Sequence, residues 1–378
     1  MTGESEKLSL ATALTVGLNA AVGAGVFSAP IALYRTAGPI GITAYLLTTV
    51  LILFIGLAFT KLLQKQKSAS FLYDFPALWG GKVAGTISLI LYSSGLVVAL
   101  GLLGKIAGEL LALVSNCANP TLWGVALILA TALGSQMGTA WLTWGQYILF
   151  LLTVIPMLII STLGLRFGSL EKLFPVAPHG ISSILWALPI VAFGFFGFEA
   201  IPALFSRIKN PEKNAARAII ATIVITGALY MLFVGSIFYL LPESAYQEQS
   251  LGAALLSVLI HYQWLVAIIN WAIIITIAGT LYSMFPAITN LICQAQKMIS
   301  QQITALIIPI GAIIIMVSAN NVLTLFNLTA LGIAGSYGMT TYALLTKSLK
   351  PTLSELLIGA LGCIASLILC LCALMGLW

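Results

Sequence analysis

Apolar stretches of about twenty residues alternate with short polar connections along the whole chain, and this length suits a helix that crosses a bilayer. The pattern predicts about eleven membrane-spanning helices. Their expected ranges are 10–34, 39–62, 83–113, 121–138, 141–165, 183–205, 216–241, 263–292, 302–319, 322–346 and 353–376. The expected fold class is therefore an all-α polytopic membrane protein.

The first apolar stretch is interrupted in its middle. Residues 10–34 read LATALTVGLNAAVGAGVFSAPIALY, with Gly23, Ala24 and Gly25 at the centre and Pro30 after them. Glycine lowers helix propensity, and proline removes a backbone donor and clashes with the carbonyl one turn back. A break in the helix is therefore expected here.

A matching interruption lies about half the chain further on. The stretch at 183–205 contains Gly194 and Gly197 and then Pro202, in the same order as the first. Small residues also let membrane helices pack closely, and either interruption alone has that simpler explanation. As a pair in corresponding halves of the chain, they predict two discontinuous helices that meet at one binding site.

Glu199 lies in the middle of this second interrupted stretch. An ionised carboxylate near the bilayer centre costs at least about 3 kcal/mol, so its side chain is expected to face the protein interior or an aqueous cavity. We expect it to take up and release a proton during function. The alternative is a structural glutamic acid that bonds a neighbouring helix.

Composition and charge agree with a membrane protein: 60% of residues are hydrophobic, 7% are charged, and the net charge is +6. If the amino terminus is cytoplasmic, most basic residues fall in cytoplasmic connections, as the positive-inside rule requires. These residues are Lys7, Lys61, Lys65, Lys67, Lys82, Arg207, Lys209, Lys213, Arg217, Lys297, Lys347 and Lys350. The charge therefore indicates topology in the cell (plasma) membrane and gives no sign of a nucleic-acid partner.

Enzymatic motifs are missing from the sequence. The five cysteines form no C-x-x-C pair, and there is no phosphate-binding glycine loop, nucleophile elbow or HExxH pair. We therefore expect neither an enzyme nor a bound metal or cofactor. Transport driven by an ion gradient or by exchange remains.

Three runs of residues resemble the amino acid/polyamine/organocation permeases. They are GAGVFxxP at 23–30, GFE at 197–199, and KNPEKN at 209–214 with Arg217 following. The resemblance covers about 1–346, and it is the combination of the three runs that makes it specific.

This resemblance implies a LeuT-like core of two inverted five-helix repeats, at about 10–165 and 183–346, with the first and sixth helices unwound at the substrate site. Residues 347–378 would then form one additional helix, where family members usually have two. The function implied is secondary active amino acid transport by alternating access.

The resemblance also implies the site. Backbone groups of the first break would hold the substrate carboxylate, which agrees with the free N–H groups and positive potential of a helix amino end. Carbonyls near the second break, at Phe193 and Phe196, and that of Ala21 on the facing helix would hold the ammonium. The implied substrate-binding residues are Ala21, Val22, Gly23, Ala24, Gly25, Phe193, Phe196 and Gly197. Phe193 matches a gating aromatic, although plain packing is the simpler explanation for two of the four phenylalanines at 193–198.

The coupling ion stays open between H⁺ and Na⁺. Glu199 matches an acid that the family commonly links to proton coupling or gating. Thr153 matches a position where some proton-coupled members place a lysine, so that lysine is absent from this chain. Hydroxyls of Thr280 and Ser283 would complete a sodium site, unless they bond their own helix backbone.

Few acids lie within the apolar stretches. Glu199 lies deep, and Glu109 lies near the end of the third stretch, one turn from Lys105, with which we expect a local ion pair. A polyamine or dibasic amino acid would need more acids, so we expect a small or apolar neutral L-amino acid as the substrate. The alternatives are an exchanger of an amino acid for its amine, and a non-transporting sensor or scaffold.

Overall fold

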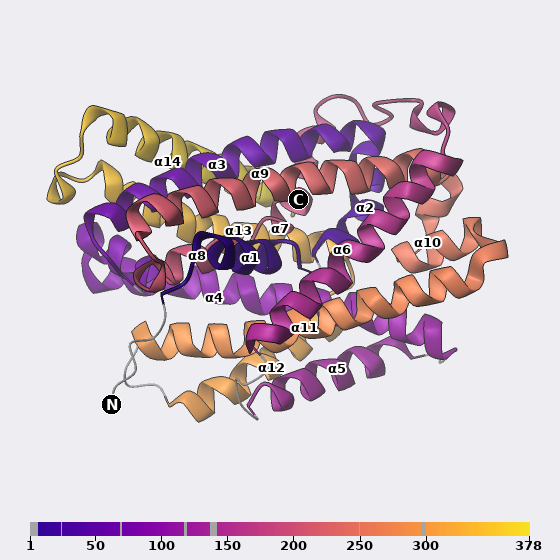
Figure 1. Ribbon diagram of the computed structural model, residues 1–378, viewed down its shortest axis with the longest axis horizontal. Coiled ribbons are helices and arrows are strands. Elements are labelled where there is room, and N and C mark those ends of the chain that lie inside the picture. The colour runs from indigo at the N-terminus through magenta and orange to yellow at the C-terminus, as the bar shows by residue number, and fades with distance from the viewer. Residues whose placement is uncertain are drawn as a thin grey trace.

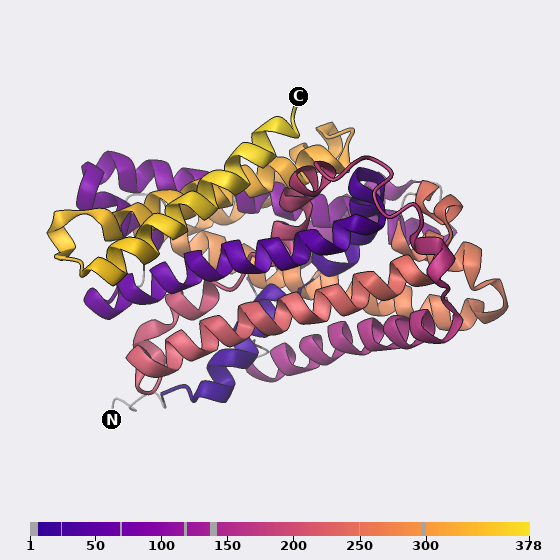
Figure 2. The same ribbon diagram turned by 90° about the horizontal axis from the view of Figure 1, so that it is seen from above.

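The computed structural model describes residues 7–23, 25–68, 70–116, 119–136, 142–248, 250–295 and 300–378. The described residues are nearly all helical, and the only β-structure among them is an isolated parallel bridge between Leu8 and Ile208. The helices are α1 (Leu10–Ala21), α2 (Gly25–Ala37), α3 (Ile42–Lys65), α4 (Phe71–Ser115), α5 (Pro120–Gly134), α6 (Leu142–Phe167), α7 (Ser183–Phe193), α8 (Ala200–Ala203), α9 (Pro211–Leu240), α10 (Leu251–Val258), α11 (Gln263–Ala295), α12 (Gln301–Ser318), α13 (Val322–Tyr342) and α14 (Leu353–Met375). Most of the long helices run along the long axis of the molecule (Figures 1 and 2).

The predicted all-α membrane fold is confirmed. Among the described residues, 8 helical stretches are long and apolar enough to cross a membrane. One of them contains both α2 and α3, which a 3₁₀ turn at Gly38–Gly41 joins. The helices α1, α5 and α7 are apolar but shorter, and α1 and α7 each form one half of a predicted span.

Both predicted breaks interrupt helices in the middle of the bundle. Figure 1 shows α1, α7 and α8 between α3 and α9 on one side and α4 and α11 on the other. The broken helices pack on continuous ones, α1 on α9 and α6, α2 on α9 and α4, and α7 on α3 and α13. These neighbours can satisfy or shield the backbone groups freed at the breaks.

The long helix α4 consists of two parts. Gly80 and Gly81 have non-helical backbone angles, and Gly81 has φ 62°, so the helix is kinked there. Trp79, just before the kink, donates from Nε1 to Met339 O at 3.0 Å and packs edge-on against the Tyr342 ring. The segment before the kink is thereby attached to α13.

The last helix, α14, is anchored to the core at its first turn. Thr352 and Glu355 form a capping box, which satisfies free N–H groups at the helix start. Lys65 at the end of α3 forms an ion pair with Glu355 at 3.0 Å. This is the only ion pair among the residues that the structure describes.

The expected ion pair between Lys105 and Glu109 is wrong. Lys105 Nζ instead donates to Ala319 O at 2.7 Å. Ala319 is the C-cap of α12, where terminal carbonyls lack helical donors and the helix dipole favours a cation. Lys105 is thereby engaged by another helix, and no salt bridge joins it to Glu109.

Candidate functional site

The first break separates α1 from α2. The helix α1 ends at Ala21, and the Val22 N–H closes it by donating to Leu18 O at 2.6 Å. Val22 and Gly23 are buried, and Gly25 begins α2. Ala24, which the resemblance places among the substrate-binding residues, lies outside the described residues. The first turn of α2 therefore begins inside the protein, where its N–H groups lack helical partners.

The second break separates α7 from α8. The helix α7 ends at Phe193, residues 194–199 form turns, and α8 is only 4 residues long. Gly197 has φ 121°, a region that side-chain-bearing residues rarely adopt. Glycine is needed at this position for its backbone conformation.

The two breaks lie against each other. A Cβ atom added to Gly197 would collide with the carbonyl oxygen of Ala20 in α1. A Cβ added to Gly25 would lie 3.0 Å from the Phe193 ring. The structure therefore brings the predicted first-break and second-break residues into contact.

Tyr230 of α9 links the two breaks. Its hydroxyl lies 2.8 Å from Ala21 O and 3.0 Å from Gly194 O, so its single proton is shared between a carbonyl of each broken helix. Both carbonyls are among those left without helical donors by the breaks. Tyr230 therefore occupies part of the acceptor capacity of Ala21, for which the resemblance implies contact with the substrate ammonium.

Glu199 is buried beside the second break, with 6% of its surface exposed. Its Oε2 accepts from the Gly197 N–H at 2.7 Å, and its Oε1 accepts from the Tyr92 hydroxyl at 2.7 Å. In a continuous helix the Gly197 N–H would go to Phe193 O. The Glu199 carboxylate thus takes the donor that the broken helix releases, and Phe193 O is left without its helical partner.

The four phenylalanines of the second break pack on different neighbours. Phe195 and Phe198 are core residues, packed on Tyr230 and on Phe59 respectively. Phe193 borders Gly25 and meets the Phe326 ring edge-on at 5.2 Å. Phe196 is half-buried and meets the Tyr337 ring edge-on at 6.0 Å. The Phe193 ring is therefore the one whose contact with the first break is seen directly.

The predicted ion-site hydroxyls lie along neighbouring turns of α6 and α11. Thr280 is next to the first break, because a Cβ on Gly23 would be 3.1 Å from its Oγ1. Thr153 donates to Leu149 O and lies 3.2 Å from the Thr276 hydroxyl of α11. Thr280 and Ser283 each donate to a carbonyl of their own helix, Thr276 O and Thr280 O.

The hydroxyl bonds are compatible with either ion. A hydroxyl that donates its proton can still accept, so the bonds of Thr280 and Ser283 to their own helix neither favour nor exclude a cation. The described residues contain no group of three or more His, Cys, Asp or Glu that could hold a metal ion.

The sequence patterns missed three residues of this region: Tyr92, Tyr230 and Thr276. Both tyrosines stand in the middle of apolar stretches, at LILYSSG and GALYMLF. A buried tyrosine hydroxyl needs a hydrogen-bond partner, and this requirement was the available signal. It could not identify the partners, which are distant in sequence.

Comparison with solved structures shows the fold. A mutant form of a manganese transporter from Eremococcus coleocola superposes with a TM-score of 0.69 at 14% identity, over 99% of this chain and 88% of that one. The likeness at this identity concerns the fold alone, and it confirms the expected LeuT-like architecture.

Two sequence relatives come from Bacillus subtilis. The serine/threonine exchanger SteT is 26% identical over 251 residues, which is 64% of this chain and 57% of the exchanger. Spore germination protein B2 is 27% identical over 240 residues, 62% of this chain and 64% of that protein. The match thus spans less than two thirds of either relative.

The family assignment comes from a match along most of the chain. Residues 8–297 match the model of the amino acid permease family, a range that contains both breaks and Glu199. This chain therefore belongs to the amino acid permease family.

Proposed function

We propose that the protein is a secondary active transporter that moves a small or apolar neutral L-amino acid across the cell membrane by alternating access, coupled to protons. The observation that carries the proposal is the contact of the two helix breaks, Gly197 against Ala20 and Gly25 against Phe193. Two discontinuous helices that cross in the middle of a membrane bundle are the usual form of a transporter site.

The breaks offer complementary groups for a zwitterion. The amino end of α2 at Gly25 provides free N–H groups and a positive potential for the carboxylate. The carboxyl end of α7 provides Phe193 O, whose helical donor is taken by Glu199, for the ammonium. The Phe193 ring then covers the substrate from the side of the second break.

The state of Glu199 favours a neutral side chain on the substrate. Each carboxylate oxygen accepts a hydrogen bond within the protein, from Gly197 or Tyr92, so the buried carboxylate is already stabilised without a cationic substrate group. A basic substrate would bring a buried charge without a dedicated partner, which is costly.

The same contacts support coupling to protons. Protonation of Glu199 would weaken its hold on the Gly197 N–H, because an ionised acceptor forms the stronger hydrogen bond. Gly197 is the residue packed on Ala20, so a change in its backbone would shift α7 and α8 against α1. A proton would thereby bias the equilibrium between conformations of the two broken helices.

The test is an uptake panel in proteoliposomes that contain the purified protein. We expect accumulation of radiolabelled L-alanine, L-serine or L-leucine that depends on an inward proton gradient and not on a sodium gradient. Uptake of lysine or putrescine in preference to all neutral amino acids would contradict the substrate class. Accumulation driven by sodium alone would overturn proton coupling.

Exchange is the second candidate, favoured by the similarity to a serine/threonine exchanger. In that case uptake needs amino acid inside the liposome and no ion gradient, and counterflow measures it directly. A non-transporting sensor built on the same fold is the third candidate. A sensor would bind an amino acid in detergent and show neither uptake nor counterflow.

A further inference from the structure

A cavity lies beyond the first break along α2, toward the end of the bundle where α10 is found (Figure 1). It has a volume of about 70 Å³ and is lined by residues of α2, α4, α10, α11 and α13 and by Ser250 just before α10. Ser28 of this lining donates to Gly25 O at 2.6 Å. The cavity is therefore one helical turn away from the break but separate from it.

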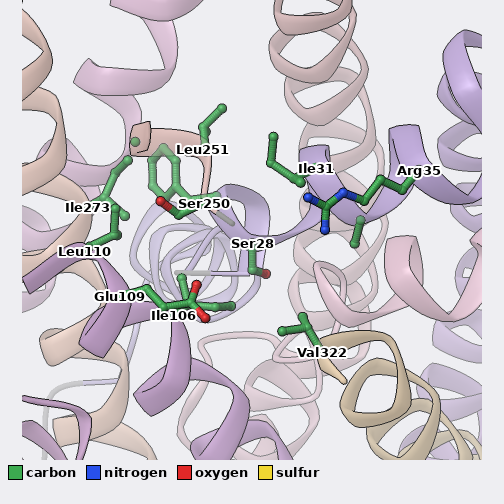
Figure 3. Close-up of a pocket in the computed structure, with 13 residues that line it drawn as sticks. Ser28, Ile31, Arg35, Ile106, Glu109, Leu110, Ser250, Leu251, Ile273 and Val322 are labelled. Atoms are coloured by element: carbon green, nitrogen blue, oxygen red, sulfur yellow. The ribbon is translucent and has the colours of Figure 1, made fainter. Parts of the chain in front are cut away.

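Two opposite charges enter this cavity from opposite sides, with Ser28 between them (Figure 3). Arg35 stands at the exposed mouth, where Nε donates to Tyr246 O at 2.6 Å and Nη2 to Glu248 O at 2.9 Å. These bonds fix the guanidinium plane and leave Nη1 without a partner among the described residues.

Glu109 faces Arg35 from α4. It is half-buried and has no hydrogen bond or ion pair within the described part of the chain, since Lys105 is engaged by Ala319 O. Lys105 and Arg35 act on Glu109 electrostatically, but Lys105 does not line the cavity. A half-buried carboxylate without a bonded partner is costly, and a ligand that brings a donor would remove that cost.

We propose that this cavity is a second binding site for a small zwitterionic amino acid, with its carboxylate on Arg35 and its ammonium on Glu109. A zwitterion satisfies both charges at once, whereas a simple anion or cation would be repelled by one of them. The Ser28 oxygen, which has given its proton to Gly25 O, can accept from the ammonium.

The size of the cavity limits the ligand. One water needs roughly 10–15 Å³ of such space, so about 70 Å³ holds a group of roughly five to seven heavy atoms, the size of alanine or serine. The walls beside Glu109 are Ile106, Leu110 and Ile273, which suit a short apolar side chain. The ligand class rests on the proposed function, while the site rests on the Arg35 and Glu109 geometry alone.

The test counts binding sites for radiolabelled L-alanine on the purified full chain by equilibrium dialysis. We expect two sites in the native protein, one in Glu109→Gln, and two in Glu171→Gln, which removes an exposed carboxylate outside the cavity. Gly25→Val, which fills the first break, should keep one site. Propionate and ethylamine each lack one charge of alanine. They should compete for the site that remains in Gly25→Val at least tenfold more weakly than unlabelled L-alanine does. Thermal unfolding of each variant confirms that it is folded.

One site in the native protein that Glu109→Gln leaves intact would overturn the proposal, as would the absence of L-alanine binding in every form. These outcomes are distinct from failure of the proposed function. If the native protein transports L-alanine but has a single binding site, and Glu109→Gln leaves that site intact, the proposed function stands and there is no second site. Native protein that binds L-alanine at a site lost in Glu109→Gln, but neither transports nor exchanges it, has the second site without the proposed function.

Discussion

Gly197 lies so close to Ala20 that no side-chain carbon fits between its Cα and the Ala20 carbonyl oxygen. Its φ of 121° is also a conformation that other residues avoid. Steric contact and backbone conformation thus both require glycine at the crossing of the two broken helices. This crossing is where the proposed substrate site is built.

Gly197→Ala should abolish uptake and lower the free energy of unfolding by about 1–3 kcal/mol, the usual cost of a strained backbone position. Uptake in proteoliposomes and thermal unfolding measure the two effects. Gly235→Ala is the matched control, because a Cβ there meets only the end of Ile42 at 3.8 Å. Normal uptake by Gly197→Ala would mean that the breaks do not need this contact.

Gly25→Val should abolish uptake while the protein still folds. The added β-branched side chain would enter the space between the amino end of α2 and the Phe193 ring. Gly25→Ala should be milder, since its Cβ lies 3.0 Å from a ring that can shift by a few tenths of an ångström. The initial rate of uptake should therefore fall from the native protein to Gly25→Ala and further to Gly25→Val. Equal rates for the two variants would contradict the placement of the substrate beside Gly25.

Tyr230→Phe should lower the free energy of unfolding by about 1–3 kcal/mol, because it leaves two buried carbonyls, Ala21 O and Gly194 O, without their shared donor. It should also slow uptake, since the two breaks lose the bond that links them. Tyr246→Phe provides the control, because that hydroxyl donates to Ile237 O away from the breaks. If both variants slow uptake equally, Tyr230 has no special role at the site.

Sequence patterns were sufficient for the breaks and insufficient for their partners. Glycine and proline act through local backbone preference, so Gly197 and Gly25 could be recognised from their own neighbourhoods. Tyr230 depends on carbonyls 209 and 36 residues away, and no local pattern encodes that distance. Tertiary packing decides such contacts.

The predicted ion pair of Lys105 with Glu109 was wrong for the same reason. Its spacing from Glu109 permits an ion pair within α4, but the free carbonyl at the end of α12 offers a competing acceptor. Helix spacing describes neighbours on one helix only, and a long lysine side chain also reaches the next one. Sequence patterns therefore could not predict the cavity beside Glu109.

Phe193→Ala should raise the apparent KM or lower turnover, because the ring borders the first break, whereas Phe193→Trp should be tolerated or should change side-chain preference. The alanine variant also loses core packing against Phe326, so its stability should fall by about 3–5 kcal/mol. Phe238→Ala removes a buried ring that packs on Tyr34 and Tyr246 and should reduce stability without changing KM. Unchanged kinetics for Phe193→Ala would leave this residue with a packing role only.

Glu199→Gln should retain substrate binding and lose the pH dependence of uptake, or lose uphill accumulation while exchange continues. Glutamine keeps the shape of the side chain but fixes the neutral state. Its amide oxygen can still accept from the Gly197 N–H, and its NH₂ group can donate to the Tyr92 hydroxyl, which then acts as the acceptor. The hydrogen-bond network therefore survives the substitution, and only the ability to ionise is removed.

Tyr92→Phe tests the hydrogen bond to Glu199 separately from the ability of Glu199 to ionise. It removes the donor to Oε1 but leaves the carboxyl group in place, so uptake should remain pH-dependent. Uptake measured from about pH 5 to pH 8 at constant gradient distinguishes the two variants. If Glu199→Gln instead shows the full native pH profile, Glu199 is a structural residue that only holds the Gly197 N–H, and the coupling proton binds elsewhere.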